Sequence, residues 1–63
     1  MYLMSEEIIY KDDITNINYK IYTENPRLDG YTIYKKYFDS DWIYVDNLPT
    51  RAKAIAKVKE LCL

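Results

Sequence analysis

Residues 50–63 read TRAKAIAKVKELCL and form the segment of the chain with the clearest helical period. They follow a stop signal, Asn-Leu-Pro at 47–49. Thr50 is suited to be the N-cap, because its hydroxyl can accept a hydrogen bond from a free N–H of the first turn. Apolar residues spaced three and four apart share one helical face, namely Ala54, Ile55, Val58, Leu61 and Cys62. The stretch predicts a C-terminal helix that packs on the rest of the chain, with Leu48 closing the near end of its apolar face.

Three stretches before this helix predict strands. Residues 15–23 alternate between Thr, Ile or Tyr at odd positions and Asn, Lys or Tyr at even ones, which is typical of a half-buried antiparallel strand. Residues 31–38 are rich in aromatic and β-branched residues, and a bulge near Lys35 would let both Tyr37 and Phe38 find cover. Residues 42–46 predict the last strand, with two aliphatic side chains on one side (Ile43, Val45) and the others opposite them (Trp42, Tyr44, Asp46).

Turn signals separate these strands at Asp12-Asp13, at 25–30 and at 39–41. Residues 1–11 fit a helical turn or a short strand at 8–10, and we favour a strand or an extended arm. Together these strands, turns and the helix predict a single small α+β domain over 1–63. Its fold is an antiparallel three- or four-stranded meander with one C-terminal helix packed on one face. The predicted core consists of Ile17, Tyr19, Ile21, Ile33, Ile43, Val45, Leu48, Ile55, Val58 and Leu61.

Composition argues against several classes of function. The chain has no histidine and one cysteine, Cys62. A zinc site needs about four Cys, His or carboxylate ligands, and histidine is the commonest general base at neutral pH. Asp39, Asp41 and Asp46 lack the spacing of a calcium loop and fit turn chemistry better. We therefore expect no enzyme, no catalytic residue, no metal and no cofactor, and an inert, buried Cys62 thiol.

Localisation and source follow from other features of the sequence. No apolar run approaches the roughly 18 residues that cross a bilayer, and residues 1–4 lack the basic start of a signal peptide. We expect a cytoplasmic protein without membrane contact. Ile, Tyr, Lys and Asn make up 27 of the 63 residues, and their A/T-rich codons indicate an A/T-rich genome. The shortness of the chain then favours a phage or another mobile element as the source.

The charges are segregated along the chain. From Thr50 onward there are four cations and one acid, a net charge of +3, and before it five cations and nine acids, a net charge of −4. The total of −1 argues against nucleic-acid binding over the whole surface. The basic helix face at Arg51, Lys53 and Lys57 has two interpretations: a solvated face, which we favour, or a secondary site for phosphate or an acidic partner.

The predicted register gathers aromatic and basic residues on the sheet face away from the helix. Such a face has three interpretations. Its side chains stabilise a small sheet through cross-strand pairs, anchor a protein partner, or stack bases and hold phosphates. The candidate partner-binding residues are Lys20, Tyr22, Tyr34, Lys36, Trp42 and Tyr44.

The layout resembles that of the small arm-type DNA-binding domains of tyrosine integrases. The matching features are 30–34 (Gly-Tyr-Thr-Ile-Tyr), Trp42, and Thr50 with Ala54 in a basic helix, over about half of the chain. The resemblance implies DNA reading by the sheet, yet those domains are basic and this chain is acidic.

These observations predict a small non-enzymatic binding protein, a regulator or inhibitor of phage or mobile-element type that acts through protein–protein contact. The alternative is a nucleic-acid-binding module that uses the aromatic and basic sheet face. A third hypothesis is the subunit of a homo-oligomer, because a domain this small with bare sheet edges gains stability from pairing.

Overall fold

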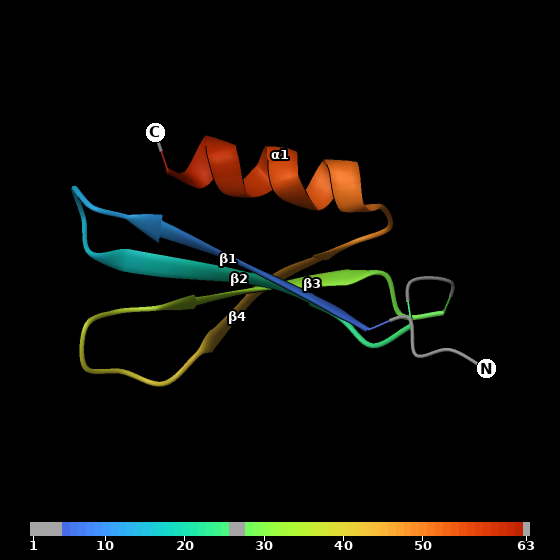
Figure 1. Cartoon of the computed structure of the whole chain (residues 1–63), viewed down its shortest axis with the longest axis horizontal. Helices are drawn as coiled ribbons and strands as arrows, with labels where there is room; N and C mark the ends of the chain where they lie inside the picture. The colour runs from blue at the N-terminus through green and yellow to red at the C-terminus, as the bar shows by residue number, and fades with distance from the viewer. Residues whose placement is uncertain (1–4, 26–27, 63) are drawn as a thin grey trace.

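The computed structural model describes residues 5–25 and 28–62. It contains one antiparallel sheet in the order β1-β2-β3-β4, and a C-terminal helix, α1, that packs against one face (Figure 1). The elements are β1 (Glu6–Asp12), β2 (Ile17–Thr23), β3 (Tyr31–Lys36), β4 (Ile43–Leu48) and α1 (Arg51–Leu61). The predicted α+β meander with one C-terminal helix is confirmed, and the strand favoured near the N-terminus is β1. Residues 1–4 of that ambiguous segment lie outside the described residues.

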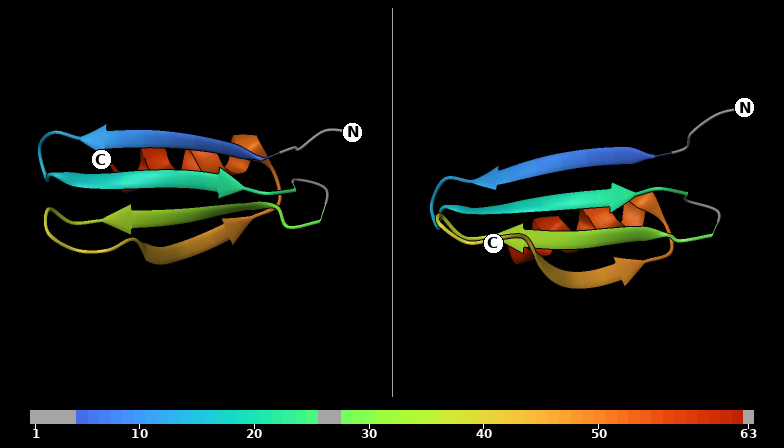
Figure 2. Two further views of the ribbon diagram at one scale, coloured as in Figure 1. Left: turned by 60° about the horizontal axis from the view of Figure 1, so that its bottom comes forward. Right: turned by 90° about the horizontal axis from the view of Figure 1, so that it is seen from below.

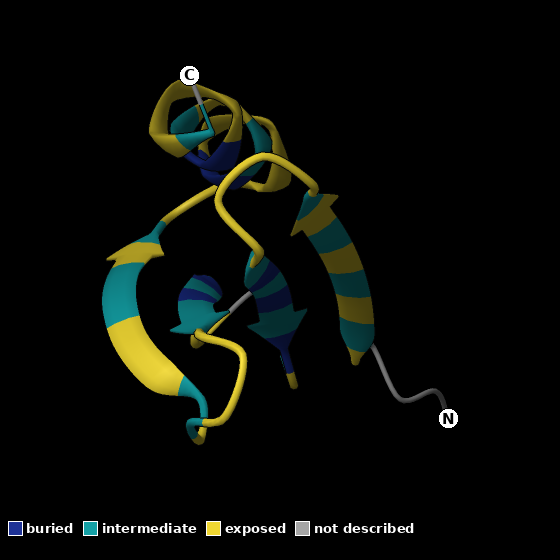
Figure 3. Cartoon of the chain, turned by 90° about the vertical axis from the view of Figure 1, so that its left-hand side faces the viewer, coloured by how far each residue is buried: buried dark blue, intermediate teal, exposed yellow. Residues whose placement is uncertain are grey.

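The helix begins where its cap predicts. The Thr50 hydroxyl accepts a hydrogen bond from the N–H of Lys53 at 3.2 Å, which satisfies one of the free donors of the first turn. Ala54 and Val58 are fully buried on the underside of α1. They pack on four side chains of β2 and β3, namely Tyr19, Ile21, Tyr31 and Ile33. Figure 3 shows the buried part of α1 above the buried stretches of the sheet.

A bulge lies in β4 rather than in β3. Ile33 pairs with Asp46 and Tyr34 with Tyr44, so Val45 is the extra residue between them. The predicted bulge near Lys35 is therefore wrong. The bulge also places Asp46 opposite Ile33, on the helix side of the sheet rather than the predicted far side.

Tyr37 and Phe38 do not find the predicted cover. The third strand ends at Lys36, and the next residues form a turn in which the Ser40 N–H donates to the Tyr37 carbonyl at 3.2 Å. The Ser40 hydroxyl also accepts from the Tyr37 N–H at 3.0 Å. Both aromatic side chains are exposed, and Phe38 is 84% exposed. Local turn bonds thus end the strand before its aromatic tail reaches the core.

Two residues predicted in the core lie outside it. Ile43 is 42% exposed and Leu61 is 38% exposed. From the end of β4, α1 runs back along the sheet toward the β1–β2 turn (Figure 1). The start of β4, with Ile43, lies away from the helix, and Leu61 falls at the flank of the last turn. Four other predicted core residues are partly buried against the core: Ile17, Val45, Leu48 and Ile55.

The turn before β2 includes Thr15 and Asn16, which the sequence pattern assigned to the strand. The Asp12 carboxylate accepts the N–H of Ile14 at 3.0 Å and that of Thr15 at 3.4 Å. Asn16 adopts a positive φ of 62°, and its N–H donates to the Asp12 carbonyl at 2.8 Å. The strand therefore starts at Ile17 rather than at Thr15.

Gly30 is required where the next loop enters β3. Its φ is +69°, a conformation that glycine adopts without steric cost. A Cβ at this position would lie 2.8 Å from the Leu48 carbonyl oxygen. The turn predicted at Asp29-Gly30 is confirmed, and Pro26 lies outside the described residues.

Candidate functional site: the open face of the sheet

The sheet face opposite α1, here called the open face, carries no other element of the described chain (Figure 2). Residues directly opposite one another in an antiparallel sheet point to the same face. The register therefore arranges this face in three cross-strand rows. These rows are Lys11-Asn18-Lys36, Ile9-Lys20-Tyr34-Tyr44 and Glu7-Tyr22-Thr32-Asn47.

Lys20 lies at the centre of the open face. Its ammonium nitrogen is 4.6 Å from the centroid of the Trp42 ring and 5.3 Å from that of Tyr34. It is also 3.7 Å from the Glu7 carboxylate, and the side chain is 19% exposed. Cation–π attraction grows as the cation loses water. Lys20 is thus held by two rings and one acid rather than extended into solvent.

The aromatic side chains continue from this centre. Tyr34 and Tyr44 pack edge to face, with ring centroids 6.5 Å apart and an interplanar angle of 82°, an arrangement that aromatic quadrupoles favour. Lys36 lies 5.8 Å from the Trp42 centroid. Trp42 precedes β4 instead of opening it, yet its ring lies over the open face. Tyr44 is 61% exposed and is the most accessible ring of this group.

Tyr22 occupies the third row, beside the aromatic centre. Its hydroxyl donates to the Glu24 carboxylate at 3.3 Å. Desolvation, and next the negative charge of Glu24, raises the pKa of Tyr22. All six predicted binding residues therefore share the open face, while their binding of a partner stays a prediction.

Two apolar side chains extend this surface beyond the predicted set. Ile9 is 59% exposed in the row of Lys20, and Phe38 stands beyond the end of β3. The alternation of residues within 6–12 could have placed Ile9 on the open face. Adjacent Ile8 and Ile9 also fit a helical turn, so the sequence alone does not fix the face to which each side chain points. The exposure of Phe38 follows from the turn bonds of Ser40.

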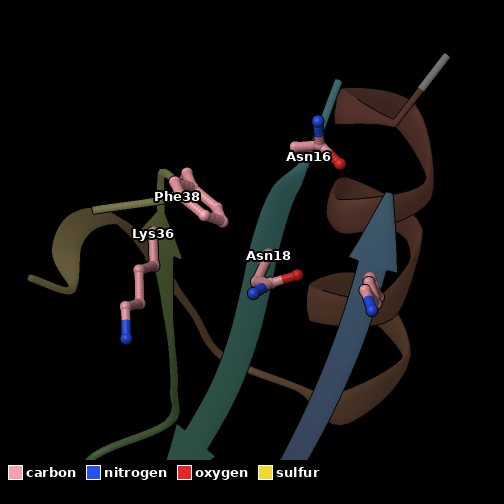
Figure 4. A pocket seen from close by; sticks show the side chains of 5 residues that line it. Asn16, Asn18, Lys36 and Phe38 are labelled. Atoms are coloured by element: carbon pink, nitrogen blue, oxygen red, sulfur yellow. The ribbon is translucent and has the colours of Figure 1, made fainter. Parts of the chain in front are cut away.

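A basic hollow lies at the Asn18 end of the open face. It has a volume of about 330 Å³ and is lined by Lys11, Asn16, Asn18, Lys36 and Phe38. Figure 4 shows Lys36 and Phe38 on one side and the two asparagines along β2 and the turn before it. Among the described residues, no carboxylate lies within ion-pair distance of Lys11 or Lys36. Two cations without a carboxylate partner, beside two amides and a ring, suit an anionic group attached to an apolar one.

The basic face of α1 is largely paired. Arg51 donates from Nε to the Glu6 carboxylate at 2.9 Å, and this hydrogen bond, followed by the charge of Glu6, raises the pKa of the Arg51 guanidinium. Lys57 lies 4.0 Å from Glu60, and Lys53 is exposed. The structure thus places Arg51 and Lys57 beside acids, and their role as a secondary site stays a prediction.

The remaining candidates are the carboxylates and the Cys62 thiol. Across residues 5–25 and 28–62, no three His, Cys, Asp or Glu side chains are placed to hold a metal ion. Cys62 is half-buried against the core, and its burial, followed by the nearby Asp12 charge, raises the pKa of its thiol. A raised thiol pKa favours the protonated, unreactive form.

In the described part of the chain, no helix has both the length and the apolar character needed to span a bilayer. Comparison with known proteins adds no relative, because no family model, curated protein or solved structure matches the chain.

Proposed function

We propose that this chain is a non-enzymatic binding module, a small regulator or inhibitor that holds a protein partner on the open face of its sheet. The observation that carries the proposal is the assembled aromatic centre, in which Lys20 holds Trp42 and Tyr34 and leaves Tyr44 exposed beside them. Side chains already fixed in place lose little conformational entropy on binding. Tyr and Trp in such positions are frequent anchors of protein interfaces.

The apolar rim of the open face favours protein over nucleic acid. Ile9 is an exposed aliphatic side chain in the same row as Tyr44, and it offers contact area to a protein but no ring for stacking a base. The faces of Tyr34 and Trp42 already have a lysine ammonium above them. Base stacking uses a free ring face, and the face of each ring that meets Lys20 is already occupied by its ammonium.

Charge defines the chemistry of the partner. Lys11 and Lys36 lie at one end of the open face without a carboxylate partner among the described residues. Glu7 lies at the other end, where it pairs with Lys20. The proposed partner therefore presents an apolar or aromatic group toward Tyr44 and Ile9, and carboxylates toward Lys11 and Lys36. Such complementarity sets orientation and association rate more than affinity.

Capture of a partner from a nuclease-treated lysate of the native host tests this proposal. The immobilised protein is expected to retain one protein in stoichiometric amount, and Tyr44→Ala is expected to reduce that capture at least tenfold, the loss typical of an anchor residue. Tyr37→Ala is the matched control, because Tyr37 is an exposed tyrosine in the turn after β3. Equal loss in both variants, or loss of capture on nuclease treatment, contradicts the proposal.

A second candidate function, binding of single-stranded nucleic acid, is favoured by the basic hollow. There Lys11 and Lys36 suit a phosphate and Phe38 suits a base. Titration with a single-stranded oligonucleotide, followed by Trp42 fluorescence, separates the two functions. We expect no quenching at micromolar concentration. Clear quenching that weakens steeply with salt, as counterion release requires, would place the nucleic-acid function first.

A further inference from the structure

The two edges of the sheet differ in how they meet solvent. On the β4 side, the bulge at Val45 interrupts the ladder and Pro49 follows the strand directly, and both features hinder pairing with another chain. On the β1 side, all seven residues pair with β2 in one unbroken register. This strand contains neither proline nor glycine. Its outer backbone groups have no partner strand within the described chain, and no bulge or proline in β1 hinders pairing with another strand.

The centre of β1 is apolar and its ends are charged. Ile9 is largely exposed on the open face, while Ile8 and Tyr10 are partly buried on the helix side. Glu7 and Lys11 stand two residues to either side of Ile9, on the open face. This pattern is self-complementary, because reversing the strand about Ile9 places an acid opposite a base.

We propose that β1 pairs with β1 of a second copy of this chain, antiparallel, with Ile9 opposite Ile9. In this register Glu7 of each copy faces Lys11 of the other, and Ile8 faces Tyr10. Opposite charges and apolar groups directly across a ladder are stabilising pairs. The product is one eight-stranded sheet with both helices on the same side.

The neighbouring registers are poorer. A shift of one residue would exchange the two faces of the sheet, and would bring the open face of one copy onto the helix side of the other. A shift of two residues in one direction places Glu7 opposite Ile9, and in the other direction places Lys11 opposite Ile9. Each removes both ion pairs and shortens the ladder. Only the register centred on Ile9 uses the full strand.

The like charges at the two ends of this ladder are already engaged. Glu6 would stand opposite Asp12, but Glu6 accepts hydrogen bonds from Arg51 at 2.9 Å and from the Tyr31 hydroxyl at 3.4 Å. The Asp12 carboxylate accepts the N–H groups of its own turn. Both carboxylates therefore have partners within their own copy, which reduces their repulsion across the interface.

Charge reversal tests this register without knowledge of any other partner. The protein and the variants Glu7→Lys and Lys11→Glu are examined by sedimentation velocity at concentrations up to about 1 mM, near the weak limit of specific association. Each variant alone sets two like-charge pairs across the ladder, and we expect its dimer Kd to rise about tenfold or more. An equimolar mixture of the two variants restores both opposite-charge pairs, so the mixed dimer is expected to form with nearly the original Kd.

Thermal melting shows whether each variant is still folded. This control is needed because Glu7→Lys also removes the contact of Glu7 with Lys20 within one copy. A folded but monomeric variant that dimerises only in the mixture supports the proposal. A monomeric parent protein at every concentration overturns it. A parent dimer that both variants retain unchanged also overturns it, since the interface then lies elsewhere.

Discussion

The ammonium of Lys20 lies 4.6 Å from the centroid of the Trp42 ring, and this contact joins the middle of β2 to the residue before β4. It draws the tryptophan over the open face, although Trp42 lies outside the ladder. The same ammonium meets Tyr34 and Glu7. One lysine thus organises the surface that we propose as the binding site.

Lys20→Met tests this organising role. Methionine keeps the apolar stem and removes the charge, so the free energy of unfolding is expected to fall by about 0.5–2 kcal/mol, the range of a partly desolvated cation–π contact. Denaturant unfolding measures this loss, and the emission of Trp42 is expected to shift as its ring loosens. Lys53→Met, at an exposed helical lysine, is the control and is expected to change neither quantity. Equal effects of the two substitutions would refute the role of Lys20.

Thr23 offers a way to stabilise the fold. It is 2% exposed, and its hydroxyl has no hydrogen-bond partner among the described residues. Thr23→Val removes a buried unsatisfied group at nearly constant volume and is expected to raise the free energy of unfolding by about 1 kcal/mol. Thr32→Val is the matched control, because the Thr32 hydroxyl accepts from Asn47 Nδ2 at 2.9 Å. That substitution is expected to destabilise, and a loss of stability in both variants contradicts the assignment.

Two isoleucines that differ in burial are expected to differ in how much their replacement lowers the free energy of unfolding. Ile33 is fully buried under α1, whereas Ile43 stands at the uncovered corner of the sheet. Ile33→Ala is expected to lower the free energy of unfolding by about 2–5 kcal/mol, and Ile43→Ala by well under half of that. Thermal or denaturant melting of the pair checks this. Similar losses would show that the helix covers the corner of Ile43.

The turn between β1 and β2 predicts a specific dependence of stability on pH. The Thr15 hydroxyl, followed by the N–H of Ile14, lowers the pKa of the Asp12 carboxyl below its ordinary value. A carboxyl with a lowered pKa binds its proton more weakly in the folded than in the unfolded state. It therefore adds stability above the unfolded pKa of about 3.9, and this stability is lost as pH falls through the folded value.

Asp12→Asn isolates this effect, since the amide oxygen can accept the same backbone bonds without titrating. The parent is expected to be the more stable protein near pH 7, and its advantage is expected to disappear as pH falls through the lowered folded pKa of Asp12, where this carboxyl becomes protonated. Unfolding curves of both proteins across this range measure it. An advantage that is independent of pH would contradict the role of the Asp12 charge.

The elements that sequence predicted correctly are those whose local signals agree. The cap at Thr50, the apolar helix face with buried Val58, and the turn at Gly30 each rest on residues within a few positions of one another. Ala54 was placed on that face but not in the predicted core, although it is fully buried. The open face was also predictable, because a period of two fixes the side of every residue until the ladder is interrupted. Tyr22 and Tyr34 therefore lie where alternation predicts.

Most of the errors arise where distant parts of the chain decide the outcome. Whether Val45 or a residue near Lys35 forms the bulge depends on how two strands pair, which local alternation does not encode. Asp46 changes face as a consequence. The exposure of Ile43 depends on the direction in which α1 crosses the sheet, which local propensity does not encode. The early end of β3 is a separate, local error, because the bonds between Ser40 and Tyr37 span only three residues.

The central claim, that the open face binds a protein, is tested most directly by the indole N–H signal of Trp42 in a ¹⁵N correlation spectrum. The chain has a single tryptophan, so this signal is unambiguous. On addition of the protein captured from nuclease-treated lysate, the indole signal and the backbone signals of Lys20 and Tyr44 are expected to shift or broaden, while those of Lys53 and Glu60 on α1 stay in place. Shifts confined to α1, with the indole signal unchanged, would contradict the account.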